Sequence, residues 1–243
     1  TSEWAGAPLN AVLRAAELVV ATTEIIFSGA DRGSVGESAK EISYERSLTV
    51  DKATAGSVLL AYEMNGEALN MHHGAPIRLI VPGWYGMASV KWLERITAVR
   101  EQFRGHFQTE DYVVRLSDDS YPCREMEPRA IVVTPQNGSV IVSGAPISVT
   151  GYAWSGHGEI THVTVSFEGQ EPLVEADLAP IMSRHAWRVW SAEVTAPSSG
   201  EHRLSARASD SAGNSQPLTH VWNPGGYNNN GVVPSRISVV DSD

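Results

Sequence analysis

The sequence has 243 residues, of which 42% are hydrophobic and 19% are charged. This length suits two domains of about 100 to 150 residues each better than a single core. The formal net charge is −10 and no run of lysine or arginine occurs. No nucleic-acid partner is therefore expected, because a phosphate backbone is bound by clustered positive charge. The single cysteine, Cys123, excludes internal disulfides and multi-cysteine metal sites.

No membrane partner is expected from the sequence. No stretch approaches the roughly 20 continuous apolar residues that span a bilayer. The N-terminus also lacks the basic, apolar and small-residue order of a signal peptide. The compartment stays open, because any targeting segment would lie upstream of Thr1.

The first third of the chain contains a predicted helix and a predicted strand. Pro8 suits a first helical turn, and Leu9, Val12, Leu13 and Ala16 recur at helical spacing, so residues 8–18 are expected to form a short amphipathic helix. The apolar run at residues 24–27 predicts a strand. A loop with two glycines is expected at residues 28–33, and a loop at the end of a strand is a frequent place for ligand contacts.

A hairpin and a buried strand are predicted next. The apolar run at residues 58–64 is followed by Asn65-Gly66, a pair that favours the positive backbone angles of a tight hairpin turn. Residues 77–81 have the pattern of a buried strand interrupted by Arg78. This arginine needs a partner, because an unpaired buried charge is very costly. Residues 89–99 are expected to be extended.

The second half of the chain has an all-β pattern. Residues 118–135 are rich in charges and prolines, which suits an interdomain crossing. Beyond them, short alternating runs predict strands at 147–154, 160–167, 187–194, 202–208, 220–222 and 236–240. Turn-rich segments separate these runs, as is typical of an antiparallel immunoglobulin-like sandwich. The predicted fold is therefore an α+β domain followed by an all-β immunoglobulin-like sandwich.

Several segments resemble one family. Residues 73–83 and 86–93, which include Ser89-Val90-Lys91-Trp92-Leu93, resemble the signature stretch of the sulfite oxidase family of molybdopterin enzymes. Residues 59–66 are similar to the hairpin before that signature, and residues 151–156, 210–217 and 222–224 are similar to the family's dimerisation domain. The resemblance implies a partial oxidoreductase molybdopterin-binding domain at 1–122, a linker at 123–130 and an immunoglobulin-like Mo-cofactor dimerisation domain at 131–243.

The resemblance also implies a site for a molybdenum–molybdopterin cofactor. A carboxylate suits the amino and amide donors of a pterin, and an arginine fork suits its phosphate. On the residues alone, Asp31 could instead cap a loop, Arg78 could belong to a buried ion pair and Lys91 could be an exposed strand lysine. The positions that match the family's cofactor-binding residues are Asp31, His73, Arg78, Ser89, Val90 and Lys91.

The resemblance assigns one catalytic residue and a set of substrate-pocket residues. Tyr112 matches the active-site tyrosine beside the metal, and Trp4 matches a tryptophan that borders the substrate-anion pocket; both could otherwise be packing residues. Where the family has arginines that bind sulfite, this sequence has His157 in one place and Arg184 with His185 in the other. Histidine is only fractionally charged at neutral pH. The substrate could therefore be sulfite, a related sulfur compound or another small redox-active molecule.

The metal ligand of the family has no counterpart here. In the family a cysteine upstream of the Trp4 motif holds the molybdenum, and only Thr1, Ser2 and Glu3 precede that motif in this sequence. Cys123 is expected to be an ordinary thiol. No metal ligand is therefore expected within the sequence.

Two functions follow from the resemblance. The first is a sulfite-oxidase-type oxidoreductase that transfers an oxygen atom to or from a small, sulfur-containing substrate. The alternative is a catalytically inactive fragment that acts as a dimerisation or binding module. The implied partners are a second copy of the chain and an electron acceptor such as a cytochrome. The acceptor would be separate, because no heme-attachment pattern occurs in this sequence.

Overall fold

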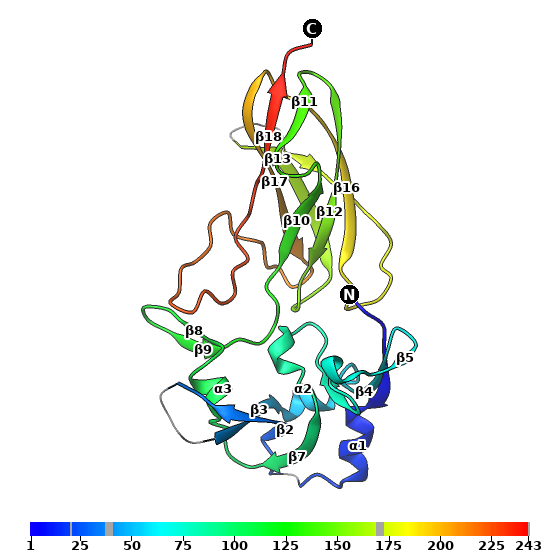
Figure 1. Ribbon diagram of the computed structural model, residues 1–243, viewed down its shortest axis with the longest axis vertical. Coiled ribbons are helices and arrows are strands. Elements are labelled where there is room, and N and C mark those ends of the chain that lie inside the picture. Colours follow the sequence, from blue (N-terminus) through cyan, green and yellow to red (C-terminus); the bar gives the residue numbers. More distant parts are fainter. Residues whose placement is uncertain (20, 37–40, 169–172, 243) are drawn as a thin grey trace. The chain divides into compact units, whose positions relative to one another are not determined.

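The computed structural model describes residues 1–19, 21–36, 41–168 and 173–242. The described chain consists mostly of β-strands, with a few short helices (Figure 1). It divides into two compact units. Unit 1 comprises Thr1–Arg124 and Asn223–Tyr227, and unit 2 comprises Glu125–Trp222 and Asn228–Asp243.

Unit 1 is built on two small sheets and two short helices. One sheet is antiparallel, with strand order β3 (Glu41–Thr49), β2 (Glu24–Ser34) and β7 (Leu93–Val99). In the other sheet β4 (Leu59–Met64) pairs with β1 (Trp4–Pro8), β5 (Glu67–Ala68) and β6 (Arg78–Ile80). The two helices are α1 (Leu9–Ala15) and α2 (Val50–Thr54).

The core of unit 1 explains why these elements form. Leu9 and Leu13 of α1 are buried, as their helical spacing predicts, but Val12 is 37% exposed, so the buried face is narrower than expected. Both leucines belong to one apolar cluster that also contains Phe27 of β2 and Leu79 of β6. The helix and both sheets therefore share one core.

Two predictions about the turns of unit 1 had different outcomes. The hairpin at Asn65-Gly66 is confirmed: it joins β4 to β5, and both turn residues have positive φ, of 54° and 79°. The loop expected at residues 28–33 is wrong, because β2 continues to Ser34. Its register against β3 shifts between Ser28 and Arg32, so Asp31 lies in a bulged part of a strand.

The rest of unit 1 consists of short segments. Two 3₁₀ turns, η1 (Met71–His73) and η2 (Gly86–Ala88), flank strand β6. A helical turn, α3 (His106–Thr109), precedes a small hairpin formed by β8 (Val113–Arg115) and β9 (Ser120–Pro122). No helix in the described part of the chain is long and apolar enough to cross a membrane.

Unit 2 contains two sheets that share one core. The first has the order β10 (Arg129–Thr134), β12 (Pro146–Trp154), β16 (Arg188–Thr195) and β15 (Asp177–Leu178). The second has the order β11 (Ser139–Val142), β18 (Ser235–Val240), β17 (Gly200–Asp210), β13 (Ile160–Phe167) and β14 (Val174–Glu175). Trp190 of the first sheet and Leu204 of the second are fully buried members of the same cluster.

Most of the strands predicted in unit 2 are confirmed. Five of the six runs correspond to β12, β13, β16, β17 and β18. The strand predicted at 220–222 is wrong: this segment has no ladder partner in the described structure, and Val221 and Trp222 are 61% and 76% exposed. Residues 129–134, which fall partly in the predicted linker, instead form strand β10.

Candidate functional site

Lys91 lies where β2 and the loop after η1 meet. A Cβ atom added to Gly29 would lie 2.2 Å from the Oδ1 of Asp31 and 2.9 Å from the carbonyl oxygen of Lys91. A Cβ atom added to Gly74 would lie 2.8 Å from the Cβ of Lys91. Gly74 also has a φ of 93°, which L side chains rarely adopt. The two glycines therefore allow these segments to approach Lys91 and bring Asp31 beside it.

Hydrogen bonds fix this arrangement. The Nζ of Lys91 donates to the carbonyl of His72 at 2.8 Å, and the indole of Trp92 donates to the carbonyl of Met71 at 2.9 Å. The side chain of Asn70 caps η1 by accepting from the N–H of His73 at 3.0 Å. His73 is exposed at the end of this short helix.

Arg78 is a buried cation that is held by carbonyl groups. Its side chain donates to the carbonyls of His73 at 3.1 Å and Ser89 at 3.0 Å, and its guanidinium lies 5.0 Å from the ring of Trp4. Arg78 is 8% exposed, and burial lowers its pKa. None of the ion pairs among the described residues includes Arg78. The partners that its position demands are therefore carbonyl dipoles and an aromatic face, which leave its charge uncompensated.

Ser89 and Val90 are hydrogen-bonded to strand β6, which carries Arg78, and to Val81 directly after it. The hydroxyl of Ser89 accepts from the N–H of Val81 at 3.1 Å, and the carbonyl of Ser89 accepts from Arg78. Val90 is 1% exposed, and its carbonyl accepts from the N–H of Leu79 at 2.8 Å. The six predicted cofactor-binding residues thus lie on segment 89–92 and on three segments next to it, namely β2 with Asp31, η1 with His73 and β6 with Arg78.

Tyr112 lies between α3 and β8, and it is half-buried. Its φ of 54° is in the left-handed region, which is uncommon for a residue other than glycine. Its carbonyl accepts from the N–H of Cys123 at 2.7 Å, and its ring centroid lies 6.4 Å from that of Phe107. A second tyrosine, Tyr227, has its ring centroid 5.7 Å from that of Tyr112.

Tyr227 was missed by the sequence analysis. It belongs to the segment Asn223–Tyr227, which clusters with unit 1 although its flanks belong to unit 2. Asn223 is 4% exposed; its amide donates to the carbonyl of Tyr227 at 2.8 Å and accepts from the N–H of Tyr227 at 3.1 Å. The turn-forming sequence Asn223-Pro224-Gly225-Gly226 was the only local signal for this closed loop.

Tyr44 on β3 connects the surroundings of Asp31 and Tyr112. Its hydroxyl donates to the carbonyl of Met87 at 2.7 Å, and its ring centroid lies 4.6 Å from that of Phe107. Burial raises the pKa of Tyr44, and electrostatic coupling to Tyr112 and Asp31 raises it further against the opposing charge of Arg46. Tyr44 is therefore within electrostatic range of both predicted site residues.

Cys123 is buried, at 2% exposed, and it is free of disulfide bonds. Burial raises the pKa of its thiol to about 11, against the opposing effect of Arg46. A thiol binds metals as the thiolate, so a protonated, buried thiol is a poor ligand. Within the described ranges, no three His, Cys, Asp or Glu side chains are grouped so that they could hold a metal ion.

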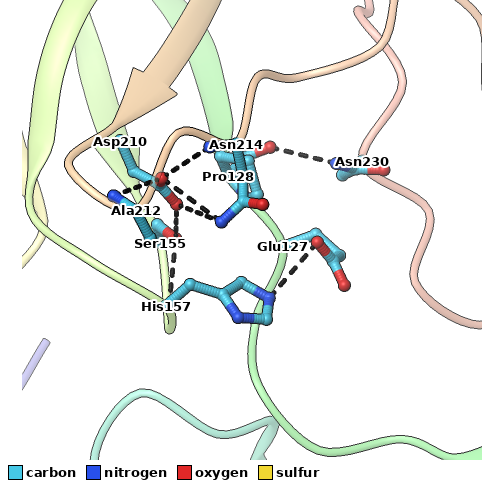
Figure 2. A network of polar contacts seen from close by, with 8 residues as sticks. All are labelled: Glu127, Pro128, Ser155, His157, Asp210, Ala212, Asn214 and Asn230. Atoms are coloured by element: carbon cyan, nitrogen blue, oxygen red, sulfur yellow. Dashed lines mark hydrogen bonds and ion pairs between the residues drawn. The ribbon is translucent and has the colours of Figure 1, made fainter.

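The predicted substrate-pocket residues divide between the two units. Trp4 belongs to unit 1. In unit 2, Arg184 lines a pocket together with Trp154 and Trp187, whose rings stack with centroids 4.3 Å apart. His157 is not among the residues that line this pocket; its Nε2 lies 3.4 Å from a carboxylate oxygen of Glu127 (Figure 2). His185 is exposed.

A buried carboxylate organises the loops next to His157 (Figure 2). Asp210 accepts hydrogen bonds from the hydroxyl of Ser155 at 2.7 Å, the N–H of Ala212 at 3.0 Å and the N–H of Asn214 at 2.9 Å. Burial opposes ionisation, but these hydrogen bonds outweigh it, so the pKa of Asp210 is lowered. The hydroxyl of Ser155 also accepts from the N–H of His157 at 3.1 Å, which links the carboxylate to the backbone of His157.

Comparisons with known proteins cover both units. Residues 1–107 match the oxidoreductase molybdopterin binding domain, and residues 120–239 match the Mo-co oxidoreductase dimerisation domain. The chain is 33% identical to mitochondrial sulfite oxidase of Mus musculus, over 99% of the chain and 47% of that protein. It is also 33% identical to sulfite oxidase of Arabidopsis thaliana, over 90% of the chain and 63% of that protein.

A solved structure agrees with these relatives. The crystal structure of the sulfane dehydrogenase SoxCD from Paracoccus pantotrophus superimposes with a TM-score of 0.79 at 28% identity, over 96% of this chain and 59% of that chain. The chain thus spans about half the length of the animal sulfite oxidases that it matches. Both domain matches, the relatives and the shared fold show that this chain belongs to the sulfite oxidase family of molybdopterin-dependent oxidoreductases.

Proposed function

We propose that this chain supplies the cofactor clamp and part of the substrate pocket of an enzyme that transfers an oxygen atom to or from a small sulfur-containing substrate. The proposal rests on the burial of Arg78, a cation whose charge no described carboxylate balances. An anionic group such as the phosphate of molybdopterin would complete this site. Two relatives, a sulfite oxidase and a sulfane dehydrogenase, are named for sulfur compounds.

Each residue of the clamp has a distinct role in this proposal. Arg78 and Lys91 bind the phosphate, the first through a fixed fork and the second as a point charge. Asp31, which is exposed beside Lys91, accepts hydrogen bonds from pterin donors. Ser89 orients Arg78 through its carbonyl, and Tyr112 donates a hydrogen bond beside the metal. When bound, the molybdenum–molybdopterin group supplies the redox chemistry.

Arg184 is the strongest of the proposed substrate contacts in unit 2. It lines a pocket bordered by two stacked tryptophans, and a guanidinium there can bind an oxyanion with two parallel hydrogen bonds. His157 is already paired with Glu127. We therefore propose no direct anion contact for His157, and the roles of His185 and Trp4 in substrate binding rest on the family resemblance alone.

For the complete assembly we propose two domains, at residues 1–122 and 131–243, joined by a linker at 123–130. The second would be an immunoglobulin-like sandwich through which two copies associate, and its match to a dimerisation domain supports this role. A separate electron acceptor such as a cytochrome would complete the reaction. Light scattering at micromolar concentration should give the mass of a dimer, and a monomer would contradict the proposed association.

The cofactor assignment is tested by Arg78→Met in the cofactor-loaded protein that contains this chain. Hydrogen bonds to charged groups contribute about 1.5–3 kcal/mol each, so cofactor affinity should fall at least about tenfold. The molybdenum-to-protein ratio after dialysis measures this fall. Arg14→Met, an exposed position on α1, is the control and should leave the ratio unchanged. An unchanged ratio in Arg78→Met would refute the assignment.

The same variant also separates binding from folding. Removing the buried charge ends its desolvation cost, but it also leaves the carbonyls of His73 and Ser89 without their donor, at about 1–3 kcal/mol each. Urea unfolding of the cofactor-free variant is therefore measured beside the molybdenum ratio, so that a loss of cofactor is separated from a loss of folded protein.

The alternative function, a cofactor-free association module, is favoured by the separate core of unit 2. It predicts a molybdenum-to-protein ratio near zero in the unaltered protein, whereas the oxidoreductase predicts a ratio near one.

A further inference from the structure

We propose that Arg46 is a positioning residue for Tyr112: its buried guanidinium ties strand β3 to the two segments that flank this tyrosine. The inference rests on the proposed function in one respect, namely the role of Tyr112 beside the metal. The tie itself is a structural statement that can be tested without the cofactor.

The side chain of Arg46 reaches both ends of the Tyr112 segment. Arg46 is 2% exposed. Its Nη1 donates to the carbonyl of Phe107, which precedes Tyr112, and its Nη2 donates to the carbonyl of Cys123, which follows it, at 3.0 Å. The N–H of Cys123 in turn donates to the carbonyl of Tyr112 at 2.7 Å. One guanidinium therefore closes the loop that carries the tyrosine.

The next residue of β3 reinforces the tie. The N–H of Ser47 donates to the side-chain oxygen of Gln108 at 3.0 Å, and the side-chain amide of Gln108 donates back to the hydroxyl of Ser47 at 2.6 Å. Both residues are buried. The hydroxyl of Ser47 donates to Glu24, which also accepts from the N–H of Phe103. The segment that leads into Tyr112 is thus anchored to β2 and β3.

The energetics of Arg46 indicate a role beyond stability. No ion pair in the described part of the chain includes Arg46, and its buried Nε has no hydrogen-bond partner. Burial lowers the pKa of the guanidinium. Burying a charge without a carboxylate partner costs several kcal/mol, which the hydrogen bonds to two carbonyls have to offset. What the charge provides here is a rigid fork that holds two carbonyls at a fixed spacing.

Tyr112 needs such a restraint. Its φ of 54° is a conformation that a tyrosine rarely adopts, and it persists only where the surroundings enforce it. Without the hydrogen bonds of Arg46, the φ of Tyr112 would relax to a negative value. The hydroxyl of Tyr112 would then move away from its place. A misplacement of about 1 Å can cost on the order of a hundredfold in rate.

The first experiment measures the tie in the 243-residue chain. Amide hydrogen exchange by NMR follows the N–H of Cys123, whose acceptor is the carbonyl of Tyr112. In Arg46→Met this amide should exchange at least tenfold faster relative to the core amide of Leu79. In Arg46→Lys, which keeps the charge without the fork, the increase should be smaller. A Cys123 amide that exchanges no faster relative to Leu79 would overturn the proposal.

A core variant provides the stability control. Val58 is fully buried in the core of unit 1, and Val58→Ala should destabilise that unit without removing the guanidinium. It should therefore speed exchange of Cys123 and Leu79 by similar factors. If Val58→Ala reproduced the selective effect of Arg46→Met, the tie would be a general stability effect and the proposal would be wrong.

The second experiment uses the cofactor-loaded protein that contains this chain. Arg46→Met should lower kcat at least tenfold, with KM and molybdenum content within twofold of the parent values. The double variant Arg46→Met/Tyr112→Phe should be no slower than Tyr112→Phe, because a positioning residue acts only through the group that it positions. Additive losses would overturn the inference.

Failure of the two proposals can be told apart. If Tyr112→Phe leaves kcat unchanged, the proposed role of Tyr112 fails, and the exchange experiment still decides whether Arg46 holds the segment. If Tyr112→Phe lowers kcat and Arg46→Met does not, the proposed function survives and the positioning role of Arg46 is wrong.

Discussion

Replacing Asp210 by asparagine tests how the loops around His157 are held in place. In the parent chain, one carboxylate oxygen accepts from Ser155 at 2.7 Å and from the side-chain amide of Asn214 at 3.2 Å. The other accepts from the N–H groups of Ala212 and Asn214 at 3.0 Å and 2.9 Å. The side-chain oxygen of the new asparagine can still accept from these two N–H groups. Its NH₂ group, however, would face the NH₂ group of Asn214, and two donors cannot form a hydrogen bond with each other.

The expected loss of stability in Asp210→Asn follows from these hydrogen bonds. A hydrogen bond to a charged group contributes about 1.5–3 kcal/mol, roughly twice a neutral one. Losing one such bond and weakening the rest should lower the free energy of unfolding of unit 2 by about 2–4 kcal/mol at pH 7. Hydrogen exchange at the buried residues Val163 and Ala206 of the second sheet measures this, because core amides report the opening of the whole unit.

The stabilisation that Asp210 provides should decrease as the pH falls. The pKa of Asp210 is lowered in the folded chain, so the unfolded chain binds the proton more tightly. The stabilisation is therefore complete above the ordinary aspartate pKa of about 4 and is lost as the pH falls through the lower folded value. The difference between parent and Asp210→Asn should shrink below about pH 4.

Asp177→Asn is the matched control, because Asp177 is exposed on β15. It should change the unfolding free energy by less than about 0.5 kcal/mol. A parent-to-variant difference that stayed constant from pH 7 to pH 3 would refute the charge-based reasoning.

Three further predictions concern other parts of the chain. Gly74→Ala forces a Cβ atom to 2.8 Å from the Cβ of Lys91 at a φ of 93°, so urea unfolding should show unit 1 weakened by about 1–2 kcal/mol, with a lower molybdenum content in the loaded protein. Trp190→Ala empties the centre of the unit 2 core and should cost about 3–5 kcal/mol, measured by exchange at the core amides. Burial raises the pKa of Cys123 to about 11, so iodoacetamide at pH 8 should alkylate it on the order of a hundredfold more slowly than in the unfolded chain; equal rates would contradict this.

Elements with strong local patterns were predictable from the sequence. The helix after Pro8 forms because Leu9 and Leu13 recur at helical spacing next to a residue that suits a first turn. The turn at Asn65-Gly66 forms because both residues tolerate positive φ. Five strands of unit 2 follow from apolar residues in alternation. In each case the physical cause lies within a few residues of the chain.

Elements whose patterns are misleading could not be read locally. The glycines at residues 28–33 indicated a loop, yet pairing with β3 carries β2 through them by means of a bulge. Residues 220–222 have the composition of a strand, but no neighbouring strand pairs with them in the described structure. Ladder partners, which lie far away in the sequence, decided both outcomes.

The sequence by itself determined the family resemblance, the succession of an N-terminal mixed domain and a C-terminal β domain, and the residues that the family motifs mark. Only the tertiary structure showed that Arg78 is buried against carbonyls instead of a carboxylate, and that Tyr227 lies beside Tyr112. Arg46 gave no local signal, because its partners Phe107 and Cys123 are 61 and 77 residues away. Hydrogen bonds of that span depend on how strands pair and loops pack, and no periodicity along the chain encodes them.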